Sequence, residues 1–236
     1  MGMPISIHIQ GNDVGSPVVA RAVEEAFGLL SEADRLFSTY KDDSEVSRIR
    51  RRELDPAAAH PLVRQVAAAC HHACELTQGA FTDQLPDDAG VLGFDPTGLV
   101  KGWAADRAGR RLADLPEASF CLNAGGDVVV GGAFAETDGE LGKAWRVGIE
   151  DPRDRSRIAE VVEIRSGGVA TSGTAARGAH LYDPERGGYV DRKGSVTVVG
   201  PNLMWADVWA TALFVGPPSL SQHFADVAVG YRMISL

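Results

Sequence analysis

The sequence is poor in cysteine, in aromatic residues and in positive charge. Only 3 of the 236 residues are cysteines, and aromatic side chains make up 7% of the chain. An odd number of cysteines without the spacing of a disulfide framework is typical of a reducing compartment. The 32 acidic residues outnumber the 23 basic ones and give a net charge of −9. A charge of this sign argues against sequence-independent nucleic-acid binding, which needs a basic surface.

Long hydrophobic runs are missing as well. No apolar run approaches the ~20 residues of a membrane-spanning helix, so we expect no membrane span. Residues 1–6 show no basic region, apolar region or cleavage site of a signal peptide. We therefore expect a cytoplasmic protein. A hydrophobic content of 44% over 236 residues is enough for one sizeable globular domain.

The spacing of the hydrophobic residues predicts a mixture of strands and helices. Segment 5–9 alternates isoleucine with polar residues, which is typical of a half-buried strand. Ser16 and Pro17 form a helix start, and hydrophobic residues then recur every three or four positions as far as Phe37. The same rules predict helices over 61–76, 98–112 and 203–214, a short helix after Ser44, and strands over 120–123, 128–130, 145–149, 158–164, 169–172 and 195–199.

No internal repeat, low-complexity tract or linker interrupts these elements. We therefore predict one α+β domain over residues 1–236, with a mostly antiparallel sheet flanked by helices.

An acidic residue and a threonine stand four positions apart in the otherwise apolar segment 206–215. On a helix, Asp207 and Thr211 would share one face. A buried carboxylate without a partner costs several kcal/mol, and two hard oxygen ligands suit Mg²⁺, which takes few protein ligands. The alternative is a helix cap together with a threonine that bonds its own backbone.

Glycine-punctuated segments place further polar residues at turns. Lys101 stands near a predicted helix start, where free backbone N–H groups favour anions. Asp127 follows two consecutive glycines, which allow either a close approach to a ligand or an ordinary turn. The small hydroxyl residues around Ser172 are able to cradle a pyrophosphate. A solvated lysine and simple turns are the alternatives.

The remaining candidates are one histidine and one cluster of cysteines and histidines. His180 shortly precedes the turn at 183–184, where the chain is stiff, and histidine is the usual general base; a structural role is the alternative. Segment 70–74 combines two cysteines with two histidines. No second cluster supplies the remaining ligands of a closed zinc site, so buried small side chains on an alanine-rich helix explain it better.

In order and content, these segments resemble the FAD:protein FMN transferase family, also called the ApbE family. The resemblance spans essentially the whole chain and implies an ApbE-like, T-fold-like architecture. The matching segments are 1–2, 37–40, 43–45, 79–81, 95–106, 123–127, 171–173, 180–184 and 195–198, followed by Ala206, Asp207 and Thr211.

The resemblance implies that the chain transfers FMN from FAD to a Thr or Ser hydroxyl of an acceptor flavoprotein and releases AMP. FAD would be the substrate, Mg²⁺ the cofactor, and a protein with a Thr/Ser flavinylation motif the partner. His180 matches the base that activates the acceptor hydroxyl. Magnesium ligands are implied at Asp207, Thr211 and a backbone oxygen of Gly98. FAD contacts are implied at Met1, Tyr40, Ala80, Phe81, Asp95, Lys101, Asp127, Ser172 and Leu181.

The chain departs from the family pattern in three places. Family members usually have Asp directly after the Ala-Phe pair, whereas here Thr82 precedes Asp83. The stretch between Phe81 and Asp95 is far shorter than usual. Residues 174–177 replace the usual aromatic and charged residues. These differences concern the packing around the adenine and isoalloxazine rings.

Three functions therefore stay open: a transferase that modifies a protein, a Mg²⁺-dependent pyrophosphatase that splits FAD into FMN and AMP, and a non-catalytic FAD-binding protein. Retention of His180, Asp207 and Thr211 argues against the third. Tyr40, an aromatic residue able to cover the flavin, favours the transferase over the hydrolase.

Overall fold

A six-stranded sheet forms the centre of the computed structural model, which describes residues 2–87, 89–133, 136–137, 140–141, 144–175, 178 and 180–236. Every neighbouring pair in this sheet is antiparallel. This confirms the predicted α+β class with a mostly antiparallel sheet. The strand order is β1 (Ile5–Gly11), β4 (Ala118–Ala124), β5 (Asp127–Gly132), β10 (Gly167–Gly173), β13 (Ser195–Gly200) and β14 (Arg232–Ser235).

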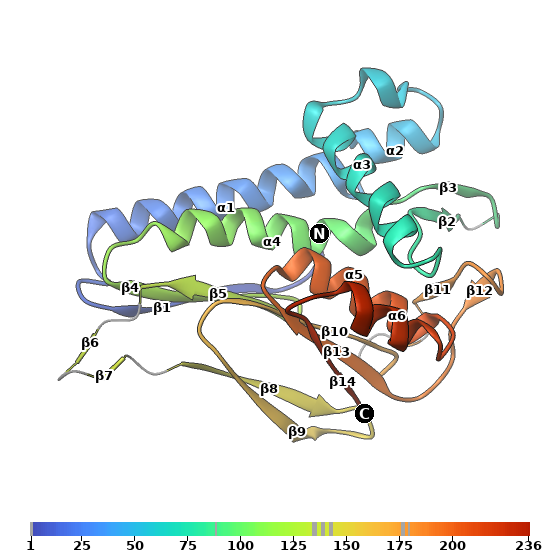
Figure 1. Ribbon diagram of the computed structural model, residues 1–236. Helices are drawn as coiled ribbons and strands as arrows, with labels where there is room; N and C mark the ends of the chain where they lie inside the picture. The colour runs from blue at the N-terminus through green and yellow to red at the C-terminus, as the bar shows by residue number, and fades with distance from the viewer. Residues whose placement is uncertain are drawn as a thin grey trace.

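Three long helices cover one face of the sheet (Figure 1). They are α1 (Pro17–Phe37), α4 (Thr97–Ala113) and α5 (Leu203–Val215). The start of α1 is the predicted one, because the Ser16 hydroxyl accepts a hydrogen bond from the amide of Val19 and Pro17 occupies the first turn. Helix α5 is buried along nearly its whole length, so its few polar residues need a structural or functional reason.

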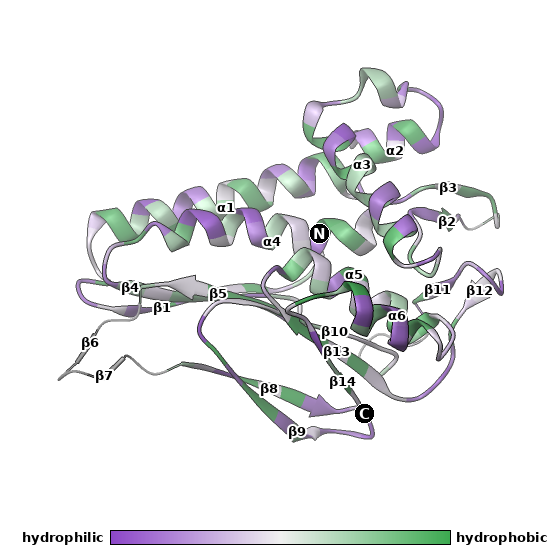
Figure 2. Cartoon of the chain, in the orientation of Figure 1, coloured by the Kyte–Doolittle hydropathy of each residue, from purple (hydrophilic) through white to green (hydrophobic). Residues whose placement is uncertain are grey.

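The opposite face of the sheet is covered by a long hairpin of β8 (Trp145–Asp151) and β9 (Asp154–Ile164) (Figure 1). Green and purple segments alternate along this hairpin in Figure 2, as expected for strands with one buried face. A second hydrophobic cluster fills the space between the hairpin and the sheet, and it includes Val128, Val130, Ile149, Val162 and Val169. The sheet therefore separates two cores, while the assignment of residues 1–236 to one domain stays a prediction.

Smaller elements surround one end of the helical layer. They are α2 (Glu45–Arg50), the 3-10 helix η1 (Pro56–Ala58), α3 (Pro61–Leu76), α6 (Leu220–Val227), and the hairpins β2 (Gln84–Pro86) with β3 (Leu92–Phe94) and β11 (Tyr182–Asp183) with β12 (Gly188–Tyr189). A further short hairpin joins β6 (Glu136–Thr137) to β7 (Glu140–Leu141). No helix in the described part of the chain is long and apolar enough to cross a membrane.

The crossing of α4 and α5 fixes how the two helices meet. A Cβ atom on Gly102 would lie 2.8 Å from the Cα atom of Met204, so only glycine allows this approach. Asp106 on α4 reaches the start of α5, where its carboxylate accepts hydrogen bonds from the amides of Leu203 (3.1 Å) and Met204 (2.8 Å). These contacts hold the two helices that carry the charged residues of the candidate site.

Candidate functional site

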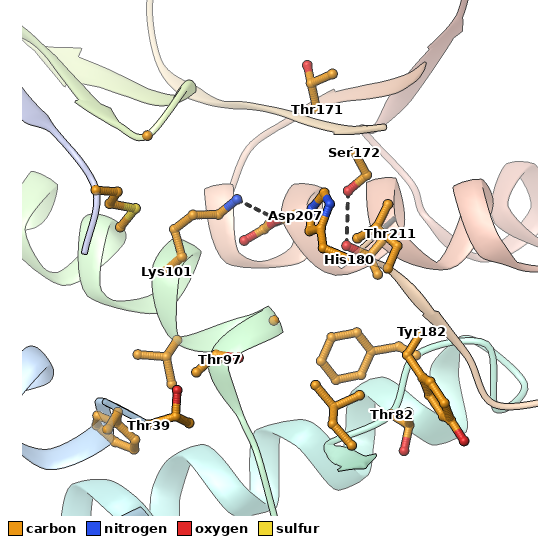
Figure 3. A pocket seen from close by; sticks show the side chains of 18 of the residues that line it. Thr39, Thr82, Thr97, Lys101, Thr171, Ser172, His180, Tyr182, Asp207 and Thr211 are labelled. Carbon is orange, nitrogen blue, oxygen red and sulfur yellow. Dashed lines mark hydrogen bonds and ion pairs between the residues drawn. The ribbon is translucent and has the colours of Figure 1, made fainter. Parts of the chain in front are cut away.

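A cavity of about 320 Å³ opens between the helical layer and the end of the sheet (Figure 3). Its walls come from the first turn of α4, one face of α5, the end of β10, and the loops before α2, after α3 and before β11. The structure brings most of the predicted site residues together here: Tyr40, Ala80, Phe81, Gly98, Lys101, Ser172, His180, Leu181, Asp207 and Thr211.

One lysine in the wall of this cavity lies between two buried carboxylates. Lys101 forms an ion pair with Asp127, and its ammonium nitrogen lies 3.4 Å from Oδ1 of Asp207. Both acidic residues are only 2% exposed. Oδ1 of Asp127 also accepts a hydrogen bond from the amide of Thr171 at 3.0 Å. The three charged groups carry a net charge of −1 when ionised, which favours a further cation.

Asp207 is the less well compensated of the two carboxylates. Its Oδ2 atom is buried and has no hydrogen-bond partner among the described residues. Burial raises the pKa of the Asp207 carboxyl to about 7, against the lowering effect of Lys101, and the charge of Asp127 raises it further. For Asp127, Oδ2 likewise lacks a hydrogen bond of normal geometry, but the ion pair with Lys101 compensates it.

Asp207 and Thr211 both line the cavity, as their spacing on one helix face predicted. The hydroxyl oxygens of Thr211 and Ser172 lie 3.0 Å apart. The alternative of a helix cap at Asp207 is wrong, because Asn202 caps α5 by accepting a hydrogen bond from the amide of Trp205. An acidic side chain in the middle of a buried helix thus faces the cavity.

The donor atoms at this place are those that Mg²⁺ prefers. They are an orphaned carboxylate oxygen of Asp207 and the hydroxyl of Thr211, on the cavity wall opposite the first turn of α4, where Gly98 lies. The described residues contain no group of three or more His, Cys, Asp and Glu that would suit a metal ion. A metal ion here would need hydroxyl, backbone and ligand oxygens besides Asp207, so the site fits Mg²⁺ better than zinc. The participation of Gly98 stays a prediction.

His180 lies in the wall of the cavity with one ring nitrogen fixed. Nδ1 lies 2.8 Å from the carbonyl oxygen of Gly178. A carbonyl oxygen only accepts hydrogen bonds, so Nδ1 carries the proton and Nε2 of the neutral ring is an acceptor. This is the tautomer that a general base needs.

Tyr40 lies at the mouth of the cavity rather than across it. The residue is 89% exposed, and its amide donates a hydrogen bond to the Ser38 hydroxyl. Phe81, by contrast, is buried and lies against the first turn of α4, where a Cβ atom on Gly98 would be 3.3 Å from its ring. The aromatic cover proposed for Tyr40 is therefore not formed within the chain itself.

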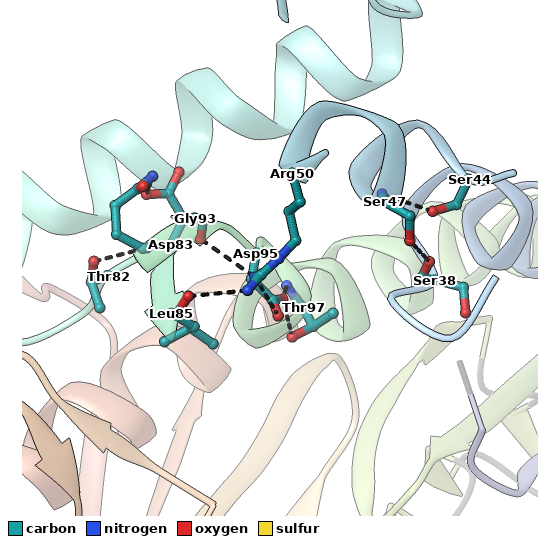
Figure 4. A network of polar contacts seen from close by, with 11 residues as sticks. Ser38, Ser44, Ser47, Arg50, Thr82, Asp83, Leu85, Gly93, Asp95 and Thr97 are labelled. Carbon is teal, nitrogen blue, oxygen red and sulfur yellow. Dashed lines mark hydrogen bonds and ion pairs between the residues drawn. The ribbon is translucent and has the colours of Figure 1, made fainter. Parts of the chain in front are cut away.

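Asp95 lies outside the cavity wall and belongs to a separate polar network (Figure 4). Its Oδ1 atom accepts hydrogen bonds from the amide (3.1 Å) and hydroxyl (2.6 Å) of Thr97. Arg50 reaches from α2 to Oδ2 of Asp95 at 3.4 Å and to the carbonyl oxygens of Leu85 and Gly93. Within the chain, Asp95 orders the start of α4 and the β2–β3 hairpin, while its predicted contact with FAD stays a prediction.

Of the two remaining predicted residues, Met1 is outside the described residues. Asp127 lines a second cavity of about 420 Å³ between the sheet and the β8–β9 hairpin, and both cavities border Gly125, Thr171 and Gly173. Arg50 and Asp106 were missed by the sequence analysis. Arg50 stands in a run of arginines, a pattern typical of a solvated helix face, and Asp106 carries no signal of its own besides its place in a matching segment.

The fold is that of an α+β protein, and its cavity brings carboxylate and hydroxyl oxygens together with one lysine. The chain belongs to the ApbE family, whose model matches residues 1–87 and 83–233. These two matches overlap in the stretch that is shorter than usual for the family.

Solved structures of this family share the fold. The flavin transferase ApbE from Vibrio cholerae has a TM-score of 0.76 and 23% sequence identity, over 100% of this chain and 94% of that chain. The ApbE protein from Thermotoga maritima has a TM-score of 0.73 and 24% identity, over 99% of this chain and 91% of that chain.

Curated relatives are similar over part of their length. A Klebsiella pneumoniae protein named FAD:protein FMN transferase is 32% identical over an alignment of 161 positions, which covers 64% of this chain and 45% of that protein. A Salmonella typhimurium protein of the same name is 28% identical over an alignment of 239 positions, which covers 79% of this chain and 68% of that protein. The chain thus spans between about half and two thirds of the length of these relatives.

Proposed function

We propose that this protein is a Mg²⁺-dependent transferase that moves FMN from FAD to a Thr or Ser hydroxyl of an acceptor protein. One observation carries the proposal: Lys101, Asp207 and Thr211 lie in the same cavity as His180, whose Nε2 is free to accept a proton. The names of the relatives support FAD as the substrate and a protein as the acceptor.

Asp207 and Thr211 would hold the metal ion through the orphaned carboxylate oxygen and the hydroxyl. Bound there, Mg²⁺ would offset the negative charge that develops on the pyrophosphate. Lys101 supplies a second positive charge that is already held in place by Asp127, so little reorganisation is needed when the phosphates arrive.

His180 would take the proton of the acceptor hydroxyl at Nε2. The acceptor oxygen then forms a bond to the phosphorus atom of the FMN half. The bond from that phosphorus to the bridging oxygen of the pyrophosphate breaks, and AMP leaves. The product is a phosphoester between FMN and the acceptor.

A pyrophosphatase that splits FAD into FMN and AMP is the second candidate. The exposed position of Tyr40 favours it, since the cavity mouth is open to water within the chain itself. In that reaction water replaces the acceptor hydroxyl and the same residues keep their roles. A purely FAD-binding protein would need neither an orphaned carboxylate nor a base with a fixed tautomer.

Mass spectrometry of a defined reaction tests the proposal. The purified protein is incubated with FAD, MgCl₂ and an acceptor protein that carries a Thr/Ser flavinylation motif, and the masses of the acceptor and the small products are measured. A transferase adds one FMN to the acceptor and releases AMP, whereas a pyrophosphatase releases both FMN and AMP and leaves the acceptor unchanged. If neither the modified acceptor nor free FMN is formed, both reactions are contradicted.

A further inference from the structure

β11 and β12 form a separate two-stranded hairpin beside the cavity. Tyr182 pairs with Tyr189 and Asp183 with Gly188. The amide of Val190 donates to the carbonyl oxygen of Leu181 at 2.8 Å, which continues the ladder by one residue.

This register shows which backbone groups of β11 are used by the hairpin. In an antiparallel pair, residues alternate between those that exchange backbone hydrogen bonds and those that do not. Because Leu181 bonds to Val190, Tyr182 and Tyr189 form the pair that exchanges none. Their rings accordingly lie close together on one face, with centroids 5.7 Å apart.

The amide and carbonyl groups of Tyr182 therefore point away from β12. Neither group makes a hydrogen bond to any other described residue. A strand edge with such groups is a template for pairing with another extended chain.

The open edge of β11 borders the candidate active site. His180, Leu181 and Tyr182 are consecutive, and all three line the cavity that contains Lys101 and Asp207. Alternate side chains of an extended segment point to opposite faces. Because three consecutive residues line the cavity, the backbone of this segment must itself border the cavity.

We propose that the acceptor docks by adding an extended segment to this edge of β11, which deepens the proposed function and rests on it. The amide and carbonyl of Tyr182 would bond the backbone of the acceptor segment, which is recognition by β-strand addition. Residues two apart lie on the same face of a strand. The acceptor residue beside His180 carries the hydroxyl, and the residue two positions away packs against the Tyr182 ring.

This mode of docking defines the acceptor by its chemistry. The segment must be extended and must have free backbone amides, so proline is excluded next to the modified residue. Its modified residue is Thr or Ser, and an apolar residue two positions away matches the aromatic pair of Tyr182 and Tyr189. The affinity for the acceptor then depends mainly on main-chain hydrogen bonds. The same edge of β11 can therefore bind acceptors of different sequence.

Proline substitutions on the two edges of the hairpin test the proposal. Tyr182→Pro removes the proposed donor, and Tyr182→Val removes the same ring but keeps the amide. Tyr189→Pro and Tyr189→Val are the matched pair on the opposite edge, because Tyr189 also uses no ladder bond. Acceptor KM is measured for all four in the FMN-transfer reaction, with circular dichroism as the folding control.

We expect Tyr182→Pro to raise the acceptor KM about ten-fold over Tyr182→Val, in line with the loss of one hydrogen bond. The Tyr189 pair should show a ratio close to one, and the KM for FAD should not differ within either pair. Equal acceptor KM values for Tyr182→Pro and Tyr182→Val would overturn the docking mode.

Hydrogen exchange of the wild-type protein gives a second test, which does not depend on the folding of a proline variant. The acceptor protein used in the mass assay, with its modified Thr changed to Val, should slow exchange at the Tyr182 amide. Protection by FAD alone, or no protection by this acceptor, would overturn the proposal. If the wild-type protein transfers no FMN, the proposed function itself fails, and that result is seen before any variant is made.

Discussion

Lys101 forms an ion pair with Asp127, a residue on the first position of β5 that is 2% exposed and lies outside the wall of the main cavity. The same ammonium group lies 3.4 Å from Asp207. Asp127 thus helps to position Lys101, whose ammonium group also lies close to Asp207, the proposed metal ligand. The position of the Lys101 charge depends on a carboxylate that the metal ion need not touch.

Asp127→Asn should weaken metal binding. With the charge of Asp127 removed, Lys101 pairs more strongly with Asp207 and competes with Mg²⁺ for that carboxylate. Charge-assisted hydrogen bonds contribute about 1.5–3 kcal/mol, so we expect the Mg²⁺ concentration for half-maximal activity to rise roughly ten-fold or more. Binding of Mn²⁺, followed by electron paramagnetic resonance, measures the same change without turnover. Asp226→Asn, on the exposed side of α6, is the control; an equal effect there would contradict the assignment.

Asp207→Asn should abolish activity and change the pH dependence of stability. Since the folded carboxyl has a raised pKa, the folded state binds a proton more tightly than the unfolded state does. In EDTA, the wild-type protein should therefore lose stability as the pH rises from 3.8 to about 7. Thermal unfolding should show this slope for the wild type and a smaller one for Asp207→Asn. Full activity of the wild type in EDTA would exclude the metal role.

His180→Asn should slow FMN transfer while sparing FAD binding. A general base typically contributes ~10²–10⁴-fold to the rate, so we expect kcat to fall by that range. Stopped-flow transfer and FAD fluorescence titration measure the two properties separately. His71→Asn is a matched control, because His71 is exposed on α3, away from the cavity. If transfer by His180→Asn proceeds at the wild-type rate, the histidine is structural.

Asp106→Ala should destabilise the fold through the start of α5. The substitution leaves the amides of Leu203 and Met204 without their acceptor, which we expect to lower the free energy of unfolding by about 1–3 kcal/mol. Urea denaturation gives this value. Asp114→Ala, at the exposed end of α4, should change it by much less. Equal losses in both variants would show that the two hydrogen bonds of Asp106 contribute little.

Tyr40→Asn should shift the products from modified acceptor toward free FMN and AMP. An aromatic ring stacked on the bound flavin contributes about 0.5–1.5 kcal/mol beyond its burial, and its loss would leave the bound flavin uncovered at the open mouth of the cavity. Chromatography of the reaction products with acceptor and Mg²⁺ present measures the ratio. Tyr40→Phe keeps the ring and should behave like the wild type. An unchanged ratio in Tyr40→Asn would remove the main support for transferase over hydrolase.

Local sequence signals were enough for helices α1 to α5, whereas α6 was not predicted. The start of α1 and the shared face of Asp207 and Thr211 depend on spacing within one helix, which the sequence contains directly. Strand β14 was missed, because its four residues become a strand only by pairing with β13. The β2–β3 and β11–β12 hairpins are equally short and were missed for the same reason.

The charge arrangement of the site was beyond sequence analysis. Lys101 and Asp127 belong to different elements, and only the folded chain shows that they form an ion pair. Arg50 looked like one of several solvated arginines, yet its side chain is only 18% exposed and ties α2 to Asp95. Such pairings depend on tertiary packing, which carries no periodic signal.

The glycine at position 102 links packing to charge. It permits α4 to approach α5 where Lys101 and Asp207 face each other, with Met204 in direct contact. Any side chain at this position would widen the separation of the two helices and so lengthen the distance between an ammonium group and a carboxylate. The spacing of the two helices therefore sets the strength of the electric field in the cavity. A change in side-chain volume at position 102 would alter the affinity for a bound cation, although this residue carries no functional group.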